Sequence, residues 1–341
     1  MIFPIQGLRA IAALYVLFLH STQLRGMFDN TGEFCVALLF IISGFLMAEK
    51  KVADARLFTT EKVAKLYPVN ILCLLIAVYI FRKELYYRWP AYLCNLFLVQ
   101  SWVPNPDFYF FSGDPVSWFL SDIMLAYLLF PWLSKLFKSH FTAGIIIFLT
   151  LSGITILAAQ FLYPQNKIDG LVYIAPYSRI LDFMAGMIAG IIASGLRRFN
   201  DNRMQAVSLV VLILALCTVS FIPKSISLTF WWYIPCALLI ISLSQGDGRN
   251  GFLGKILSGR FLVWLGDISF GIFMYHFPII WIMDVSAHKF GFTITPATQL
   301  ILALIFTVFA AYLSKKYFEH PVNARIHQLI YRHKEKPDQR V

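Results

Sequence analysis

The chain has 341 residues, of which 59% are hydrophobic and only 14% are charged. A soluble globular domain has about 45–50% apolar and about 25% charged residues, so the composition excludes a water-soluble fold. The net charge of +11 would suggest a nucleic-acid partner in a soluble chain. Here the basic residues lie mainly between apolar runs, and we expect no nucleic-acid binding. The five cysteines lie in apolar stretches without metal or redox spacing, which predicts buried small side chains and neither a disulfide framework nor a metal site.

Ten apolar runs follow one another along the chain. A bilayer span needs about 20 apolar residues, and we predict membrane-spanning helices at roughly 4–22, 34–49, 66–81, 117–134, 141–162, 178–195, 206–222, 227–244, 264–284 and 297–316. A further stretch at 92–103 is too short to span, which predicts an interfacial or re-entrant helix. The first run has no basic segment before it and no small-residue cleavage site, so we expect it to remain as the first helix.

These elements predict an all-α, polytopic membrane protein with about ten transmembrane helices. We expect a membrane domain at 1–322 and a basic tail at 323–341. Twenty Lys and Arg residues lie in the even-numbered loops and the tail, eight lie on the opposite side, and Arg9 lies within the first span. The positive-inside rule then puts both termini in the cytoplasm. If the source is bacterial, the chain is expected in the inner membrane.

Two polar residues share one face of the first predicted span. Arg9 and His20 are eleven residues apart, which corresponds to three helical turns plus about 20° and to about 16 Å along the axis. An ionised side chain at the centre of a membrane helix costs roughly 2.5–3.5 kcal/mol on insertion scales. The structural alternative is that Arg9 snorkels to the inner headgroups and His20 sits in the outer interface. Their position on one stripe favours a functional role.

Six motifs resemble, in the same order, those of the acyltransferase-3 family of integral membrane acyltransferases, which includes surface polysaccharide O-acetyltransferases. The similarity covers about residues 5–322. The motifs are Gly7–Ala13 with His20, Leu39–Leu46 with Ser43, Trp118–Leu120 leading to Tyr127 and Pro131, Pro176–Gly186 with Arg179 and Asp182, Leu265–Phe270 followed by Tyr275–Pro278 with His276, and Glu319–Pro321.

The resemblance implies transfer of an acyl group, usually acetyl from acetyl-CoA, to a sugar hydroxyl of a lipid-linked or surface glycan. No cofactor is expected beyond acetyl-CoA as the donor substrate. The local chemistry agrees, because His20 is a suitable general base for a hydroxyl near neutral pH. Arg9, Lys62 and Lys65 could meet the phosphates of coenzyme A. The expected partners are the acyl-CoA, the saccharide acceptor and membrane lipids.

Two positions depart from the family pattern. Many members carry Ser-x-Glu after Trp-x-Leu, whereas this chain has Ser121-Asp122-Ile123, so a carboxylate role there depends on Asp122. The paired arginines of the family are replaced by Lys62 and Lys65. Lysine keeps the positive charge but loses the bidentate geometry with phosphate.

His276 and Ser43 each have a structural alternative. His276 can be a hydrogen-bonded core histidine instead of a second catalytic histidine. Ser43, beside Gly44, can serve close helix packing instead of a polar contact with the acyl carbonyl.

The other candidate substrate-binding residues also have structural alternatives. Arg179 and Asp182, three residues apart, can simply pair with each other. Trp118 and Tyr127 can be packing aromatics, and Glu319 can neutralise nearby lysines.

Two other functional classes fit a chain of ten spans. A transporter or flippase of a glycan or lipid intermediate also has buried ionisable groups, but we find no inverted pair of broken helices. For a non-catalytic membrane scaffold, Arg9 and His20 on one stripe would be an unneeded insertion cost. The sequence does not identify the acceptor sugar, its hydroxyl position or the acyl group.

Overall fold

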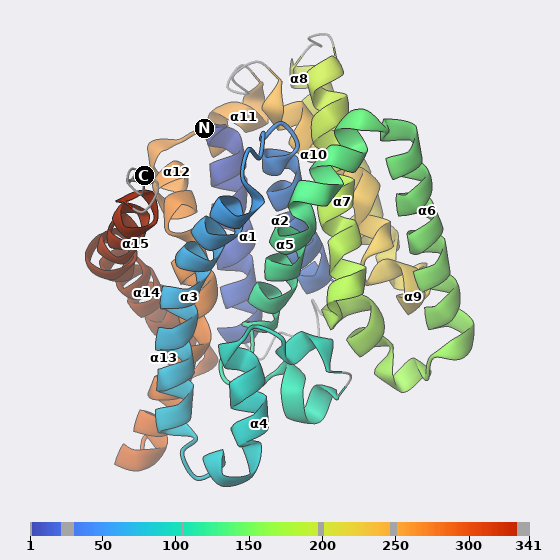
Figure 1. The fold of residues 1–341 in the computed structure, drawn as a ribbon. Helices are drawn as coiled ribbons and strands as arrows, with labels where there is room; N and C mark the ends of the chain where they lie inside the picture. The colour runs from blue at the N-terminus through green and yellow to red at the C-terminus, as the bar shows by residue number, and fades with distance from the viewer. Residues whose placement is uncertain (1, 22–30, 104, 197–200, 246–250, 333–341) are drawn as a thin grey trace, which may run out of the picture.

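A computed structural model describes residues 2–21, 31–103, 105–196, 201–245 and 251–332, which form helices and connections without a β-strand (Figure 1). The helices are α1 (Phe3–Ser21), α2 (Gly32–Met47), α3 (Ala55–Ile80), α4 (Leu85–Leu96), α5 (Trp118–Ser139), α6 (Phe141–Leu157), α7 (Pro176–Gly195), α8 (Asp201–Thr218), α9 (Lys224–Ser227), α10 (Tyr233–Ser244), α11 (Phe252–Leu257), α12 (Arg260–Asp267), α13 (Ser269–Phe290), α14 (Pro296–Ser314) and α15 (His320–Arg332). The predicted all-α membrane fold is confirmed.

Eight helices in these ranges are long and apolar enough to cross a membrane. Shorter apolar helices at Gly32–Ala48 and Phe230–Ser244 coincide with the second and eighth predicted spans. Each of the ten predicted segments thus falls on a helix, while the number that actually cross the bilayer stays a prediction.

Several predicted boundaries are wrong by a turn or more. The third span was expected at 66–81, but α3 begins at Ala55, where the Asp54 carboxylate accepts hydrogen bonds from the N–H groups of Arg56 and Leu57 at 2.9 and 3.1 Å. This N-cap extends the helix through a polar segment. The ninth span was expected to begin at 264, but the chain breaks at Ile268 between α12 and α13. In place of one re-entrant helix at 92–103, the structure has the end of α4 and a 3₁₀ turn at Gln100–Trp102.

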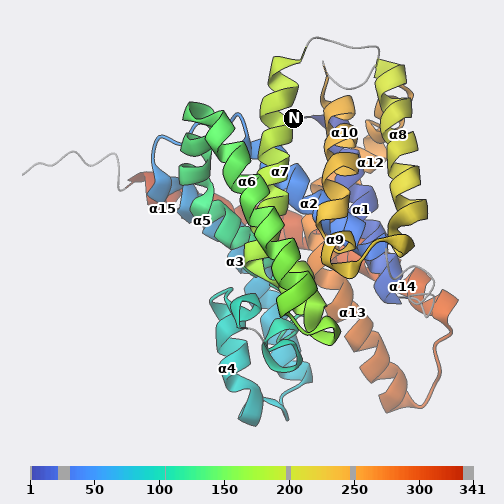
Figure 2. The same cartoon turned by 90° about the vertical axis from the view of Figure 1, so that its right-hand side faces the viewer.

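The two ends of the described chain lie in the half of the bundle away from α4. Figures 1 and 2 show α4 at one end of the bundle, which we call the α4 face, and the start of α1 toward the opposite end, which we call the terminal face, with α15 beside the bundle in the same half as the start of α1. The number of crossings and the side of the membrane on which the termini lie stay predictions. Helix α15 continues across the predicted domain boundary at 322, and 333–341 of the predicted tail lie outside the described residues.

Glycines allow the central helices to touch at their backbones. A Cβ atom at Gly44 on α2 would overlap the carbonyl oxygen of Phe183 on α7, and one at Gly186 on α7 would overlap that of Ile41 on α2. Small residues of this kind permit the close approach typical of membrane helices. The packing interpretation of Gly44 is therefore confirmed.

The N-terminal end of α1 is held in the same way. A Cβ atom at Gly7 would overlap the carbonyl oxygen of Leu257 on α11, and one at Gly266 on α12 would overlap that of Gln6. These contacts fix the turn of α1 that carries Arg9.

The predicted topology can be tested with single cysteines. Tyr86 on α4 is 92% exposed and Lys51, near the start of α3, is also exposed. With the terminal face in the cytoplasm, Tyr86→Cys should react with a membrane-impermeant maleimide in intact cells, and Lys51→Cys should react only after permeabilisation. The unsubstituted chain gives the background from its own cysteines. Labelling of Lys51→Cys in intact cells would show the opposite orientation.

Candidate functional site

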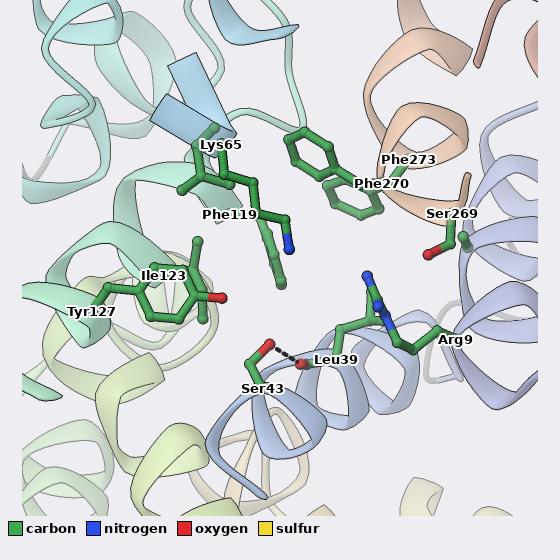
Figure 3. Close-up of a pocket in the computed structure, with 12 residues that line it drawn as sticks. Arg9, Leu39, Ser43, Lys65, Phe119, Ile123, Tyr127, Ser269, Phe270 and Phe273 are labelled. Carbon is green, nitrogen blue, oxygen red and sulfur yellow. Dashed lines mark hydrogen bonds between the residues drawn. The ribbon is translucent and has the colours of Figure 1, made fainter. Parts of the chain in front are cut away.

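Four predicted site residues from four different helices line one cavity inside the bundle. Arg9 on α1, Ser43 on α2, Lys65 on α3 and Tyr127 on α5 surround a space of about 70 Å³, which we call the cation cavity. Figure 3 shows the polar ends of Arg9, Lys65 and Tyr127 pointing into this space. The rest of the lining is Ala13, Leu39, Leu66, Phe119, Ile123, Ser269, Phe270 and Phe273.

Positive charge dominates the cavity. The Arg9 guanidinium donates a hydrogen bond to the side-chain oxygen of Gln6 at 3.2 Å, and Lys65 interacts electrostatically with Arg9 and Lys315, with Glu319 as a partial counter-charge. Lys62 is 8% exposed, and its Nζ lies 4.5 Å from the centre of the Tyr127 ring.

These three cations lack a close ion-pair partner in the part of the chain that the structure describes. No carboxylate there lies within 4.0 Å of the nitrogen atoms of Arg9, Lys62 or Lys65. Of the three side chains, Lys62 is buried, Arg9 is half-buried and Lys65 is exposed. Burial of a charge without a close counter-charge is costly, and here Asp267, Glu61 and Glu319 act only from beyond ion-pair distance. The cavity is therefore electrostatically suited to an anion.

Ser43 does not direct a proton into the cavity. Its hydroxyl donates to the carbonyl oxygen of Leu39, one turn earlier, at 2.8 Å, which Figure 3 marks with a dashed line. Ser43 thus lines the cavity while its hydroxyl proton is engaged within α2.

Aromatic rings close the cavity on the side that leads toward the α4 face. The rings of Phe119 and Phe273 lie 5.1 Å apart, and Phe119 packs on Phe40 at 4.4 Å, centre to centre. Both Phe119 and Phe273 line the cavity. We call these three rings the aromatic wall.

Two histidines lie beyond this wall. On α13, Phe273 is the last residue of the cavity lining, and His276 follows it by one turn. On α1, Ala13 is the last lining residue, and His20 lies about 10 Å further along the helix at 1.5 Å per residue. Both helices therefore carry the cavity residues first and a histidine after them.

The two imidazoles touch each other. His20 Nδ1 and His276 Nε2 are 3.0 Å apart, and the rings lie edge to edge with centres 5.1 Å apart and planes at 16°. His276 is completely buried, and its Nδ1 lies 2.6 Å from the carbonyl oxygen of Phe273. His20 is half-buried, with Phe277 at 4.6 Å from its ring centre. His276 is thus a hydrogen-bonded core histidine, as its structural alternative proposed, and it also contacts His20.

Pro278 interrupts the backbone hydrogen bonding of α13. Proline has no N–H to donate to the carbonyl four residues earlier, and its ring disturbs the preceding turn. That carbonyl belongs to Met274, and the Cys73 thiol lies 3.7 Å from its oxygen. The Cys73 thiol thus donates a hydrogen bond to the carbonyl that Pro278 leaves without a helical donor.

Arg179 and Asp182 lie outside the cavity lining. Both are completely buried, and they form an ion pair with each other on α7. The Arg179 Nε donates to the carbonyl oxygen of Tyr173 at 2.5 Å, and the guanidinium lies 4.6 Å from the Tyr173 ring centre. These contacts hold the segment Asp169–Ile174 against α7. Arg179 and Asp182 thus pair with each other, which is the structural alternative that their spacing suggested.

Three further residues also lie outside the lining. Trp118 packs on Tyr173 at 5.2 Å, behind the aromatic wall. Asp122 is buried and accepts a hydrogen bond from the Ser101 hydroxyl at 2.5 Å. Glu319 accepts a hydrogen bond from Ser314 at 3.0 Å and lies near the lysines of the terminal face.

The sequence comparisons place the chain in one family. The profile of the Acyl_transf_3 family, described as an acyltransferase domain, matches residues 4–315. Among its relatives is an acyltransferase of Streptomyces mycarofaciens, 28% identical over 80% of this chain and 78% of the relative. A putative peptidoglycan O-acetyltransferase of Bacillus subtilis is 25% identical over 94% of this chain, and a putative O-acetyltransferase of Staphylococcus aureus is 23% identical over 93%. The chain spans 55% and 56% of the length of these two. No solved structure shows significant similarity.

The chain belongs to the acyltransferase-3 family, which confirms the resemblance inferred from its motifs. It is a membrane-embedded acyltransferase.

The buried ion pair of α7 gives a first prediction for the site. Arg179→Leu leaves the Asp182 carboxylate buried without its partner and should destabilise the fold by about 3–5 kcal/mol. The double variant Arg179→Leu/Asp182→Leu should recover much of this loss. Thermal unfolding of the purified protein measures both. Glu84→Gln, which breaks the partly exposed pair with Arg88, is the control and should change stability by less than about 1 kcal/mol. A stable but inactive Arg179→Leu protein would instead place Arg179 in the reaction.

Proposed function

We propose that this acyltransferase takes the acetyl group of acetyl-CoA and transfers it to a sugar hydroxyl of a lipid-linked or surface polysaccharide. The observation that carries the proposal is the cation cavity in a member of an acyltransferase family. It is lined by Arg9 and Lys65 and adjoined by Lys62, and no described carboxylate lies within 4.0 Å of their nitrogen atoms. The names of two relatives, a putative peptidoglycan O-acetyltransferase and a putative O-acetyltransferase, support a hydroxyl acceptor and a glycan.

The charge of the cavity suits the donor. Coenzyme A carries phosphates, and charge-assisted hydrogen bonds from Arg9 can hold one of them in a bidentate manner. Lys62 and Lys65 would add point charges nearby. A space of about 70 Å³ has room for a few water molecules, so the adenosine of coenzyme A would lie outside it, while a phosphate meets Arg9 and the narrow pantetheine arm enters.

The histidine pair suits the acceptor. In the proposed reaction the acceptor oxygen forms a bond with the acetyl carbonyl carbon, and the carbon–sulfur bond of the thioester breaks. His20 takes the hydroxyl proton as this bond forms, and the proton then passes to the departing thiolate to give free coenzyme A. Such general-base assistance contributes about 10²–10⁴ in rate.

The aromatic wall separates the two halves of this proposed site. Because Phe119 and Phe273 are in contact, the thioester reaches His20 only after one of these rings moves. Donor and acceptor would then approach from opposite faces of the bundle and meet at the wall. With the terminal face in the cytoplasm of a bacterial cell, acetyl-CoA would be supplied from inside across the inner membrane.

His20→Ala tests the proposed base. We expect a loss of at least about 100-fold in coenzyme A release from acetyl-CoA by purified protein, together with loss of acetyl groups from cell glycans measured by mass spectrometry. The matched control is His288→Ala, because His288 is an exposed histidine near the end of α13. Wild-type turnover by His20→Ala would remove His20 from the mechanism.

Arg9 tests the proposed donor site. Loss of a hydrogen bond to a charged group costs about 1.5–3 kcal/mol, which corresponds to about 10- to 150-fold in Kd. Arg9→Ala should weaken acetyl-CoA binding by this amount. Arg9→Lys should weaken it by less, because lysine keeps the charge but cannot form the bidentate hydrogen bonds. Titration of the folded variants with acetyl-CoA measures the difference.

Arg56→Ala is the control for these titrations, because Arg56 is an exposed cation near the start of α3. An unchanged Kd in Arg9→Ala would leave Arg9 with only an anchoring role.

A further inference from the structure

We infer that His276 is a positioning residue that sets the tautomer of His20, so that Nε2 of His20 is the basic atom in the reaction. The inference rests on the proposed function and deepens it, since the role of His20 as a base does not by itself specify which nitrogen accepts the proton. It is carried by the two contacts of His276, one with a backbone carbonyl and one with His20.

The first contact fixes the protonation of His276. A carbonyl oxygen only accepts hydrogen bonds, so the Nδ1 that lies 2.6 Å from the Phe273 oxygen carries a proton. A second proton on Nε2 would create a cation in a side chain that is 0% exposed. No described carboxylate forms an ion pair with His276, so the neutral form is the stable one. Its Nε2 is then an acceptor.

The second contact determines which nitrogen of His20 carries the proton. Because His276 Nε2 accepts, His20 Nδ1 must donate across the 3.0 Å that separates them. In a neutral imidazole one nitrogen carries the proton and the other carries the lone pair. The lone pair of His20 is therefore on Nε2, which lies on the opposite side of its ring from Nδ1.

The surrounding rings hold this orientation. His276 lies beside His20 with the ring planes at 16°, and Phe277 lies 4.6 Å from the His20 ring centre. A half-turn of the His20 ring about its Cβ–Cγ bond would put the Cδ2 carbon in the place of Nδ1 and so would break the hydrogen bond to His276. These contacts thus favour one tautomer in one orientation.

The arrangement also suits the protonated state of the base. After His20 accepts a proton on Nε2, its Nδ1–H remains donated to a neutral acceptor, and the hydrogen bond becomes charge-assisted and stronger. A histidine that orients another histidine in this way has the role that a carboxylate has in a Ser-His-Asp triad, where loss of the correct tautomer costs about 10⁴ in kcat. A neutral acceptor stabilises the imidazolium less than a carboxylate, so a smaller effect is expected here.

The test compares two substitutions that differ in the ability to accept a hydrogen bond. His276→Leu fills part of the volume but removes the acceptor, whereas the side-chain oxygen of His276→Gln can accept from His20 Nδ1. We expect His276→Leu to lower kcat for coenzyme A release about 100-fold or more, with the Kd for acetyl-CoA within twofold of wild type. His276→Gln should recover at least tenfold of that loss.

Several outcomes would overturn the inference. One is wild-type kcat in folded His276→Leu. Another is a glutamine variant that binds acetyl-CoA normally but is no more active than the leucine variant. ¹⁵N NMR of wild-type protein with labelled histidine provides a measurement that needs no variant of His276. The signals lost in His20→Ala should show a protonated Nδ1 and an unprotonated Nε2, and the reverse pattern contradicts the inference.

The failure of the inference is distinguishable from failure of the proposed function. If wild-type protein releases no coenzyme A, or His20→Ala retains full activity, the proposed function itself is wrong. If His20→Ala is inactive while His276→Leu is fully active, only the role of His276 is overturned.

Discussion

The placement of three basic side chains at one cavity within an apolar bundle is the constraint on which the rest of the structure depends. Arg9, Lys62 and Lys65 come from two helices and line or adjoin one small space, with no described carboxylate within ion-pair distance. Lys62 is buried, Arg9 is half-buried and Lys65 is exposed, and burial of the Lys62 and Arg9 charges costs free energy. The glycine contacts of α1 with α11 and α12 hold Arg9 in place against that cost. The same fold elsewhere neutralises its buried charge, as the Arg179–Asp182 pair on α7 shows.

The candidates differ in whether a neighbouring side chain already satisfies them. A buried cation paired within its own helix, as Arg179 is, satisfies its hydrogen-bonding needs without a ligand. Asp122 likewise obtains a partner from Ser101, which gives the residue that departs from the family pattern a local role in packing. Arg9 donates a hydrogen bond to the amide oxygen of Gln6, and an amide does not balance a full charge.

Much of the fold and part of the candidate site could be predicted from the sequence. The rest could not be predicted, and the reasons are physical. Hydropathy located every long helix, because a bilayer imposes length and apolar character, but it missed the polar start of α3 and the break at Ile268. The spacing of Arg9 and His20 predicted that they share one face of α1, and they mark the two ends of the proposed site. Phe119 and Phe273 gave no signal, because a phenylalanine in an apolar span has the same pattern whether it faces lipid, core or cavity. The contact of His20 with His276, 256 residues apart, is set by packing of α1 against α13.

The position of Phe273 limits how the aromatic wall can open. Its ring closes the cavity, while its carbonyl oxygen accepts the hydrogen bond that orients His276. A shift of the α13 backbone would carry Phe273 and His276 together and would break the hydrogen bond between His276 and His20, so the base would lose its orientation when the thioester arrives. Rotation of the Phe119 or Phe273 side chain opens the wall without this penalty, because neither ring takes part in the hydrogen bonds of the histidine pair. In the proposed reaction, passage between the two halves therefore depends on side-chain rotation at the wall, and the α13 backbone stays fixed.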